Sequence, residues 1–297
     1  TTLGETISGG GGNDTLLGGG GADVINPGGG ADSVDGGTGD DVIGLGSDNA
    51  NDQITGGDGV DTVDYSSAEA PVSVDLSRGV AVDLYAGASF SGGGSLAGPS
   101  IGTDTLTDIE VVIGTPYGDV LTGSSRAETI EGRGGDDVLF DGNGADRLSG
   151  GDGNDYIFLT ADNADDSVDG GAGRDFLSYT SAGSATGISV DLAQGIATDL
   201  PNNGSSGPGI GTDRFSGIEV VVGTGHSDIL VGSAAGETLI GAAGADTVDG
   251  GGGDDTIFVN SDGGDFVTGG AGIDTLVVEA RSTDFLVSGS NGTATLT

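Results

Sequence analysis

The sequence predicts an all-β fold: a right-handed parallel β-roll, or β-helix solenoid, that is built from nonapeptide repeats and carries two inserts with wider coils. Three observations support this prediction. Glycine supplies 66 of the 297 residues, 47 residues are acidic against 7 basic ones, and a nine-residue period runs through most of the chain. With 4% aromatic residues and no Trp, Met or Cys, the chain lacks the bulky side chains that fill the core of an ordinary globular enzyme.

The nine-residue period divides the chain into three repeat blocks, at residues 1–64, 114–178 and 223–277. From Gly9 onward, the first block reads GGGGNDTLL, GGGGADVIN, PGGGADSVD and GGTGDDVIG. The blocks hold twenty repeats, in which the sixth position is always Asp or Glu and the eighth position is always aliphatic. Such regularity at a fixed period is the signature of a repeat architecture.

Each repeat separates into a turn and a strand. The first six residues are rich in glycine, which permits the positive φ of a tight turn. The last three residues are long enough only for a short strand, whose middle residue points to one face. Two repeats then form one coil of 18 residues, and the aliphatic eighth positions pack as a single layer between two sheets. A core this thin explains why few aromatic residues suffice.

The acidic sixth positions predict a cation site. Stacked coils bring each sixth-position carboxylate over the one two repeats away, where bare negative charges repel each other. Ca2+ accepts six to eight oxygen ligands, whereas Mg2+ prefers a strict octahedron and Zn2+ prefers His or Cys. The sequence holds one His and no Cys, so it favours calcium. A chain with a formal charge of −40 is expected to stay open until this charge is neutralised.

The repeat G-G-x-G-x-D-x-U-x, in which U is aliphatic, resembles the calcium-binding nonapeptide of RTX, or hemolysin-type, proteins. This resemblance implies a calcium-loaded parallel β-roll in a secreted or surface-attached bacterial protein, which folds when it meets calcium outside the cell. It also implies that each ion lies between turns i and i+2, held by sixth-position carboxylates and by turn carbonyls. Pairing every turn with the next but one gives up to about 14 ions.

The resemblance implies a specific set of ligands. The implied carboxylate ligands are Asp14, Asp23, Asp32, Asp41, Asp52, Asp61, Asp119, Asp137, Asp146, Asp155, Asp166, Asp175, Asp228, Asp246, Asp255, Asp265 and Asp274. The turn glycines implied with them are Gly10, Gly12, Gly19, Gly21, Gly28, Gly30, Gly37, Gly39, Gly135, Gly144, Gly151, Gly153, Gly251 and Gly253. The best pairs are Asp14 with Asp32, Asp23 with Asp41, Asp41 with Asp61, Asp119 with Asp137, Asp137 with Asp155, Asp155 with Asp175, Asp228 with Asp246, and Asp255 with Asp274.

Some turns depart from the family pattern. GSSRAETIE and GSAAGETLI have lost several glycines and carry the longer Glu128 and Glu237 at the sixth position, so the resemblance supports these sites less. The turns that hold Asp52, Asp166 and Asp265 contain extra residues, which can shift their carbonyls out of line. The fifth-position acids, such as Asp40, Asp136 and Asp254, are expected to face solvent rather than to bind calcium.

Two inserts, at residues 65–113 and 179–222, resemble each other: IGTDTLTDIEVVIGT in the first matches IGTDRFSGIEVVVGT in the second. Alternating apolar residues predict strands at 72–76 and 188–192, with further strands at 80–82 and 110–113. We expect the inserts to continue the solenoid with wider coils, and the Gly/Ser-rich stretches 87–100 and 202–211 to protrude as loops. A flexible linker is the alternative. Residues 278–297 are expected to form a C-terminal strand or cap, or the end of a fragment.

Six acidic residues recur in the two inserts outside any turn motif. They are Asp75, Asp104 and Glu110 in the first insert, and Asp191, Asp213 and Glu219 in the second. Additional calcium sites are possible there, but the pattern favours solvated carboxylates or carboxylates at strand ends.

Catalysis is not expected. His226 is the only histidine, which excludes a two-His metalloprotease motif, and its place in a repeat indicates a surface turn. An alternative hypothesis is a polysaccharide-active β-solenoid enzyme, with Tyr65, Tyr117, Tyr179 or His226 at a sugar site. A surface- or ice-binding adhesin region is a further alternative, although the ladder of threonines that it needs is missing.

The partners follow from charge and hydropathy. Because nucleic acids and anionic lipids are bound through Lys and Arg, an acidic chain with 7 basic residues is expected to bind calcium and no nucleic acid. No apolar run is long enough to span a membrane, so membrane insertion is not expected. We expect the chain to be part of a larger exported protein with other domains.

Overall fold

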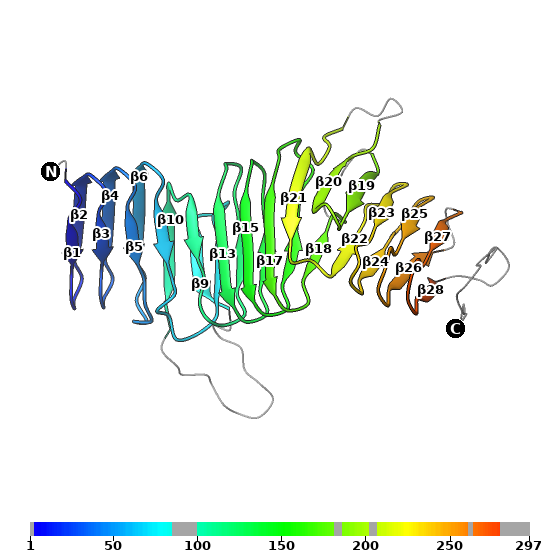
Figure 1. Cartoon of the computed structure of the whole chain (residues 1–297). Coiled ribbons are helices and arrows are strands. Elements are labelled where there is room, and N and C mark those ends of the chain that lie inside the picture. The colour runs from blue at the N-terminus through cyan, green and yellow to red at the C-terminus, as the bar shows by residue number, and fades with distance from the viewer. Residues whose placement is uncertain (1–2, 85–99, 181–185, 202–206, 261–263, 280–297) are drawn as a thin grey trace. The chain divides into compact units, whose positions relative to one another are not determined.

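The computed structural model describes residues 3–84, 100–180, 186–201, 207–260 and 264–279. Within these ranges, every regular secondary-structure element is a β-strand. The chain divides into two compact units. The first unit contains residues 1–142 and 146–153, and the second contains residues 143–145 and 154–297. Each unit is a β-solenoid whose stacked coils carry two sheets (Figure 1). The all-β solenoid predicted from the repeats is therefore confirmed.

The first unit has one sheet in the order β1-β3-β5-β7-β11-β13-β15 and a second in the order β2-β4-β6-β10-β9-β8-β12-β14. Its strands are β1 (Thr6–Ser8), β2 (Thr15–Gly20), β3 (Val24–Asn26), β4 (Ser33–Thr38), β5 (Val42–Gly44), β6 (Gln53–Asp58), β7 (Thr62–Asp64), β8 (Val72–Asp75), β9 (Val80–Asp83), β10 (Thr103–Thr107), β11 (Val111–Ile113), β12 (Val120–Thr122), β13 (Thr129–Gly134), β14 (Val138–Phe140) and β15 (Arg147–Asp152).

The second unit repeats this design, with sheets in the orders β17-β21-β20-β19-β23-β25-β27 and β16-β18-β22-β24-β26-β28. Its strands are β16 (Tyr156–Phe158), β17 (Ser167–Ala172), β18 (Phe176–Ser178), β19 (Ile188–Asp191), β20 (Ile196–Asp199), β21 (Thr212–Ser216), β22 (Val220–Val222), β23 (Ile229–Val231), β24 (Thr238–Ile240), β25 (Thr247–Asp249), β26 (Thr256–Asn260), β27 (Phe266–Thr268) and β28 (Thr275–Glu279).

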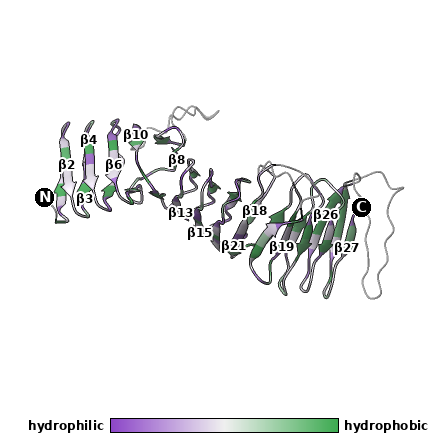
Figure 2. Ribbon diagram, turned by 90° about the horizontal axis from the view of Figure 1, so that it is seen from above, coloured by the Kyte–Doolittle hydropathy of each residue, from purple (hydrophilic) through white to green (hydrophobic). Residues whose placement is uncertain are grey.

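The strand register confirms that two repeats make one coil. Ile7 pairs with Ile25 between β1 and β3, and Leu16 pairs with Val34 between β2 and β4; both pairings are parallel. Partners thus lie 18 residues apart, and eighth-position residues of the same sheet stack over one another. Figure 2 shows the resulting bands of apolar residues on the strands.

The core is the predicted layer of eighth-position side chains. Ile25, Ile43 and Val63 are fully buried in one sheet of the first unit, as Leu239 and Ile257 are in the second unit. Each such side chain contributes about 1.5–3 kcal/mol of burial free energy. The units therefore gain their apolar stabilisation from many small, equivalent contacts rather than from one bulky cluster.

Each insert joins one sheet through antiparallel pairing. In the first unit β9 lies antiparallel between β8 and β10, while β10 pairs parallel with β6 and β8 pairs parallel with β12. The opposite sheet passes directly from β7 to β11 in parallel. In the second unit β20 lies antiparallel between β19 and β21 in the same way. A wider coil is thus a three-stranded antiparallel detour, in which a short turn joins β8 to β9 and β19 to β20.

The strands expected inside the inserts are present as β8, β9, β11 and β19. Most of the Gly/Ser-rich stretches expected to protrude, 87–100 and 202–211, falls outside the described residues, as does nearly all of the expected cap at 278–297. Across the part of the chain that the structure describes, no helix has the length and apolar character needed to cross a membrane.

Candidate calcium-binding turns

The sixth-position carboxylates are joined from coil to coil by hydrogen bonds. Oδ1 of Asp32 accepts the backbone N–H of Asp14 at 2.7 Å, and Oδ1 of Asp41 accepts that of Asp23 at 2.8 Å. Asp61 accepts the N–H of Asp41 in turn, at 2.9 Å. The predicted stacking of these sixth positions is therefore confirmed, and each unit contains columns of buried carboxylates.

The same hydrogen bond recurs through both units. It joins Asp119 to Asp137, Asp155 to Asp175, Asp228 to Asp246, and Asp255 to Asp274. The turns that depart from the family pattern also take part, because it joins Asp32 to Asp52, Glu128 to Asp146, Glu237 to Asp255, and Asp246 to Asp265. The Asp137–Asp155 pair belongs to two different units and stays a prediction.

The second carboxylate oxygen is buried without a hydrogen-bond partner in many of these turns. This oxygen, Oδ2, has no partner in Asp14, Asp23, Asp32, Asp41, Asp61, Asp175, Asp255 and Asp265. A buried charged oxygen without a partner is costly. A cation bound at Oδ2 would supply the missing interaction.

The first glycine of the repeat packs closely against the sixth-position carboxylate and the next coil. A methyl group built on Gly18 would lie 2.6 Å from Oδ2 of Asp23 and would collide with the carbonyl oxygen of Gly36, one coil further on. At Gly56 it would lie 2.7 Å from Oδ2 of Asp61. At both glycines a carboxylate oxygen and a carbonyl oxygen therefore lie so close that a methyl group would collide with them.

The turn glycines have the backbone conformation that their position requires. Gly37 and Gly39, the second and fourth residues of their repeat, have φ of 105° and 120°, which residues with a Cβ rarely adopt. Every glycine predicted to take part in calcium binding has positive φ in the structure. The glycine content thus serves turn geometry that exposes carbonyl oxygens.

These observations fit calcium. The donor atoms close to one another in these turns are carboxylate and carbonyl oxygens, which are the donors that Ca2+ prefers. Among the described residues, no group of three or more His, Cys, Asp and Glu side chains gathers that could hold a metal ion. A site in these turns therefore depends on backbone carbonyls in addition to the stacked carboxylates.

Burial raises the pKa of several carboxyl groups in the columns. Desolvation is the main cause, and repulsion from neighbouring carboxylates adds to it, while hydrogen bonds from backbone N–H groups act in the opposite direction. The pKa reaches about 6 for Asp52, Asp61 and Asp255. Without a cation, burial therefore opposes the ionisation of these three carboxyl groups.

Comparison with known proteins agrees with this geometry. A family model described as the RTX calcium-binding nonapeptide repeat, in four copies, matches residues 1–34, 28–50, 47–67, 122–157, 158–178, 231–262 and 259–278. These matches cover more than half of the chain. The protein belongs to the RTX calcium-binding repeat family. No curated protein matches the chain significantly.

The RTX columns extend into the inserts, which sequence analysis missed. Asp104 and Asp213 are each 1% exposed, so the expectation that they are solvated is wrong. Oδ1 of Asp104 accepts the N–H of Asp52 at 3.1 Å, and Oδ1 of Asp213 accepts that of Asp166 at 3.0 Å. Both aspartates precede an apolar residue by two positions, as sixth-position acids do. This spacing in the sequence could have predicted their place in the columns.

The other acidic residues of the inserts fall into two groups. Glu110 accepts the N–H of Asp61 at 3.0 Å, and Glu219 accepts that of Asp175 at 2.9 Å, so both glutamates also continue a column. Asp75 and Asp191 end their strands, as expected. Each of these two aspartates accepts backbone N–H bonds in the turn that follows.

Tyr65 closes one column inside the first insert. Its side chain is fully buried, and its hydroxyl lies 3.3 Å from Oδ2 of Asp104, to which it donates a hydrogen bond. Desolvation raises the pKa of Asp104 to about 7, and the Tyr65 hydroxyl partly opposes that shift. In the second insert Tyr179 is 1% exposed. Neither tyrosine is therefore available to a surface sugar site, contrary to the polysaccharide hypothesis.

The remaining sequence candidates lie on the surface. His226 is exposed in its turn, and Tyr117 is 44% exposed. The fifth-position acids Asp40, Asp136 and Asp254 are exposed as expected. Asp40 and Asp254 accept the backbone N–H of the next coil, from Val60 and Ile273, at 2.9 and 2.8 Å. These acids support turn stacking from outside.

Proposed function

We propose that this chain is a calcium-dependent folding module of an exported protein. The observation that carries this proposal is the set of buried sixth-position Oδ2 atoms without a hydrogen-bond partner. Membership of the RTX family, whose repeat is a calcium-binding structural module, supports it.

The proposed ligands lie in seven turns that combine two features: an Oδ2 without a partner at the sixth position, and glycine with positive φ at the second and fourth positions. We call these the open turns: 9–14, 18–23, 27–32, 36–41, 56–61, 170–175 and 250–255. The carboxylate and the turn carbonyls would hold Ca2+ between successive coils. Bound calcium would neutralise charge in the columns, so binding and folding would be coupled.

The location of the module is part of the proposal. RTX repeats are typical of secreted bacterial proteins, and the coupling proposed above gives such a protein a reason to fold late. Sensor and buffer sites bind calcium below about 10 µM, whereas extracellular modules bind at about 0.1–1 mM. We propose that the open turns belong to the second class and stay empty until the chain has left the cell.

A calcium titration of the whole chain tests this function. Circular dichroism in excess chelator should show little β signal, and addition of calcium should produce a cooperative rise, with magnesium as the control ion. An anomalous-scattering map of crystals grown with calcium would count the ions and place them. A chain that is completely folded in excess chelator would contradict the proposal.

A further inference from the structure

Four turns at the starts of the second and third blocks differ from the open turns. They span residues 114–119, 123–128, 223–228 and 232–237, and their second position holds Thr115, Ser124, Thr224 or Ser233 instead of a residue with positive φ. We call them the capped turns. In each of them, the second residue donates hydrogen bonds to the sixth-position carboxylate of its own turn.

The first capped turn closes around Asp119. Oδ2 of Asp119 accepts the backbone N–H of Thr115 at 2.6 Å. Oδ1 accepts the Thr115 hydroxyl at 2.9 Å and the N–H of Val72 at 2.7 Å. Asp119 is 1% exposed and Thr115 is fully buried. Both carboxylate oxygens, including the one that is free in the open turns, are thus satisfied by the protein itself.

The second unit contains the same arrangement. Oδ2 of Asp228 accepts the N–H of Thr224 at 2.7 Å, and Oδ1 accepts the Thr224 hydroxyl at 2.9 Å and the N–H of Ile188 at 2.8 Å. The sequences TPYGD and TGHSD that carry this arrangement share only the Thr and the Asp. The cap therefore depends on these two residues and not on the glycines between them.

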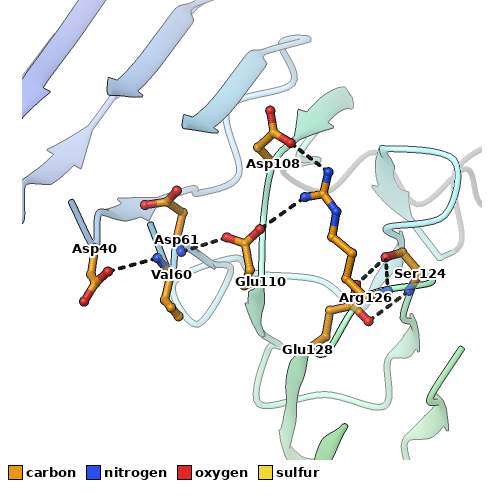
Figure 3. Close-up of polar contacts among 8 residues, drawn as sticks. All are labelled: Asp40, Val60, Asp61, Asp108, Glu110, Ser124, Arg126 and Glu128. Atoms are coloured by element: carbon orange, nitrogen blue, oxygen red, sulfur yellow. Dashed lines mark hydrogen bonds and ion pairs between the residues drawn. The ribbon is translucent and has the colours of Figure 1, made fainter. Parts of the chain in front are cut away.

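The neighbouring Glu turns are capped in the same way. The hydroxyl of Ser124 donates to Oε1 of Glu128, and the Ser124 N–H donates to Oε2 at 3.2 Å (Figure 3). Ser233 makes the same two bonds to Glu237. The Glu turns, which depart from the family pattern, are therefore capped as well.

Backbone conformation provides an independent difference. Second-position residues of regular turns have positive φ even where they are not glycine, as at Arg133 (79°) and Ala242 (65°). The Thr and Ser residues of the capped turns do not have positive φ. The capped turns thus follow a different path, which turns the second-position N–H toward the carboxylate.

We propose that the capped turns fold without calcium and form a platform at the start of each of these two blocks, onto which the open turns stack as calcium binds. Hydrogen bonds to a buried carboxylate stabilise its charged form, so donors from Thr or Ser take the place of the ion. The residue at the second position decides which kind of turn forms. Asp119 and Asp228, which the family resemblance implies as ligands, are then not calcium ligands.

Hydrogen–deuterium exchange of the whole chain in excess chelator tests the platform. Amides within 110–131 and 219–240 should exchange slowly, whereas amides within 18–44 should exchange at unfolded rates and become protected only when calcium is added. This experiment separates the two proposals. If every segment is protected in chelator, the proposed function fails; if none is protected but calcium protects all, only the platform fails.

Two variants test the residues that carry the cap. The double variant T115V/S124A removes both hydroxyls of the first platform and should speed exchange within 110–131 about tenfold or more in chelator. The second platform, with Thr224 and Ser233 unchanged, is the internal reference. T115S, which keeps a hydroxyl, should exchange like the wild type. T105V, at an exposed threonine on β10, is the control for loss of a hydroxyl elsewhere.

The number of bound calcium ions tests whether the capped turns bind calcium. If the capped turns do not bind calcium, the double variant should bind as many ions as the wild type in equilibrium dialysis. A lower ion count in the variant would show that Asp119 or Glu128 binds calcium, and would overturn the proposal. Unchanged exchange in the double variant would overturn it as well, because the hydroxyls would then not hold the platform.

Discussion

The open and capped turns solve the same electrostatic problem with different partners. Asp41, in an open turn, is fully buried with Oδ2 unpartnered, whereas Asp119, in a capped turn, is equally buried with both oxygens bonded. The donors in the capped turn come from Thr115, where the open turn has Gly37. The comparison teaches that each carboxylate in a column can be stabilised either by a bound ion or by hydrogen-bond donors of the chain itself.

The largest expected effect is a change in the stability of the calcium-free protein with pH. The raised pKa values of Asp52, Asp61, Asp104 and Asp255, about 6 to 7 against 3.8, mean that the folded state holds protons that the unfolded state releases. Without calcium, stability is therefore complete below about pH 4 and is lost as pH rises through 6 to 7, by about 3 kcal/mol or more.

Circular dichroism of calcium-depleted protein at pH 4 and pH 7 measures this loss, because the β signal should be larger at pH 4. Calcium should reverse the trend, because it needs deprotonated carboxylates. A calcium-free protein that became more stable toward neutral pH would show that burial does not control these groups.

Crowding the sixth-position carboxylate from the first position should have the next largest effect. Gly18→Ala places a methyl group 2.6 Å from Oδ2 of Asp23 and against a backbone carbonyl, and should cost about 2–3 kcal/mol of stability in calcium. Gly44→Ala is the matched control, because a methyl group there meets nothing within 4 Å. Chemical unfolding in saturating calcium compares the two, and equal stabilities would remove the proposed role of the first-position glycine.

Replacing one carboxylate in each kind of turn should give different results in chelator. Asp41→Asn keeps the acceptor for the Asp23 N–H and removes a buried charge, so it should weaken calcium binding without changing the fast exchange of residues 18–44 in chelator. Asp119→Asn places an amide NH2 where the Thr115 N–H needs an acceptor, and should cost about 1–3 kcal/mol with or without calcium. Hydrogen–deuterium exchange of both variants in each condition checks this, and parallel behaviour would mean that the two kinds of turn do not differ.

The smallest effect concerns an ion pair that the first unit adds to its platform. Arg126 lies 3.0 Å from Asp108 and 3.3 Å from Glu110 (Figure 3). The second unit has Ala235 and Gly217 at the places of Arg126 and Asp108. Because the Arg126 side chain is 56% exposed, Arg126→Ala should cost only about 0.2–1 kcal/mol. Exchange within 110–131 in low salt measures it, and a loss as large as that of T115V/S124A would contradict this ranking.

The repeats made much of the structure predictable. A period of nine, with an acid at the sixth position and an aliphatic residue at the eighth, predicted the coil of two repeats, the core and the stacked carboxylates. The antiparallel path of β9 and β20 was not predicted, because alternation indicates a strand but not its direction. The caps were not predicted either, since the Thr115–Asp119 bond depends on the local turn conformation, and a single Thr in a turn has many other uses.

The antiparallel detours also affect how binding can spread through the chain. In solenoids each repeat is coupled mainly to its neighbours, so cooperativity passes along the stack step by step. At the first insert one column ends at Asp104, beneath the hydroxyl of Tyr65, and resumes where the N–H of Val72 meets Asp119. The other column passes from Asp61 directly to Glu110. At this detour, one carboxylate column is interrupted while the other continues. Coupling between turns is therefore weaker across the insert, and a long cooperative transition is divided into shorter segments.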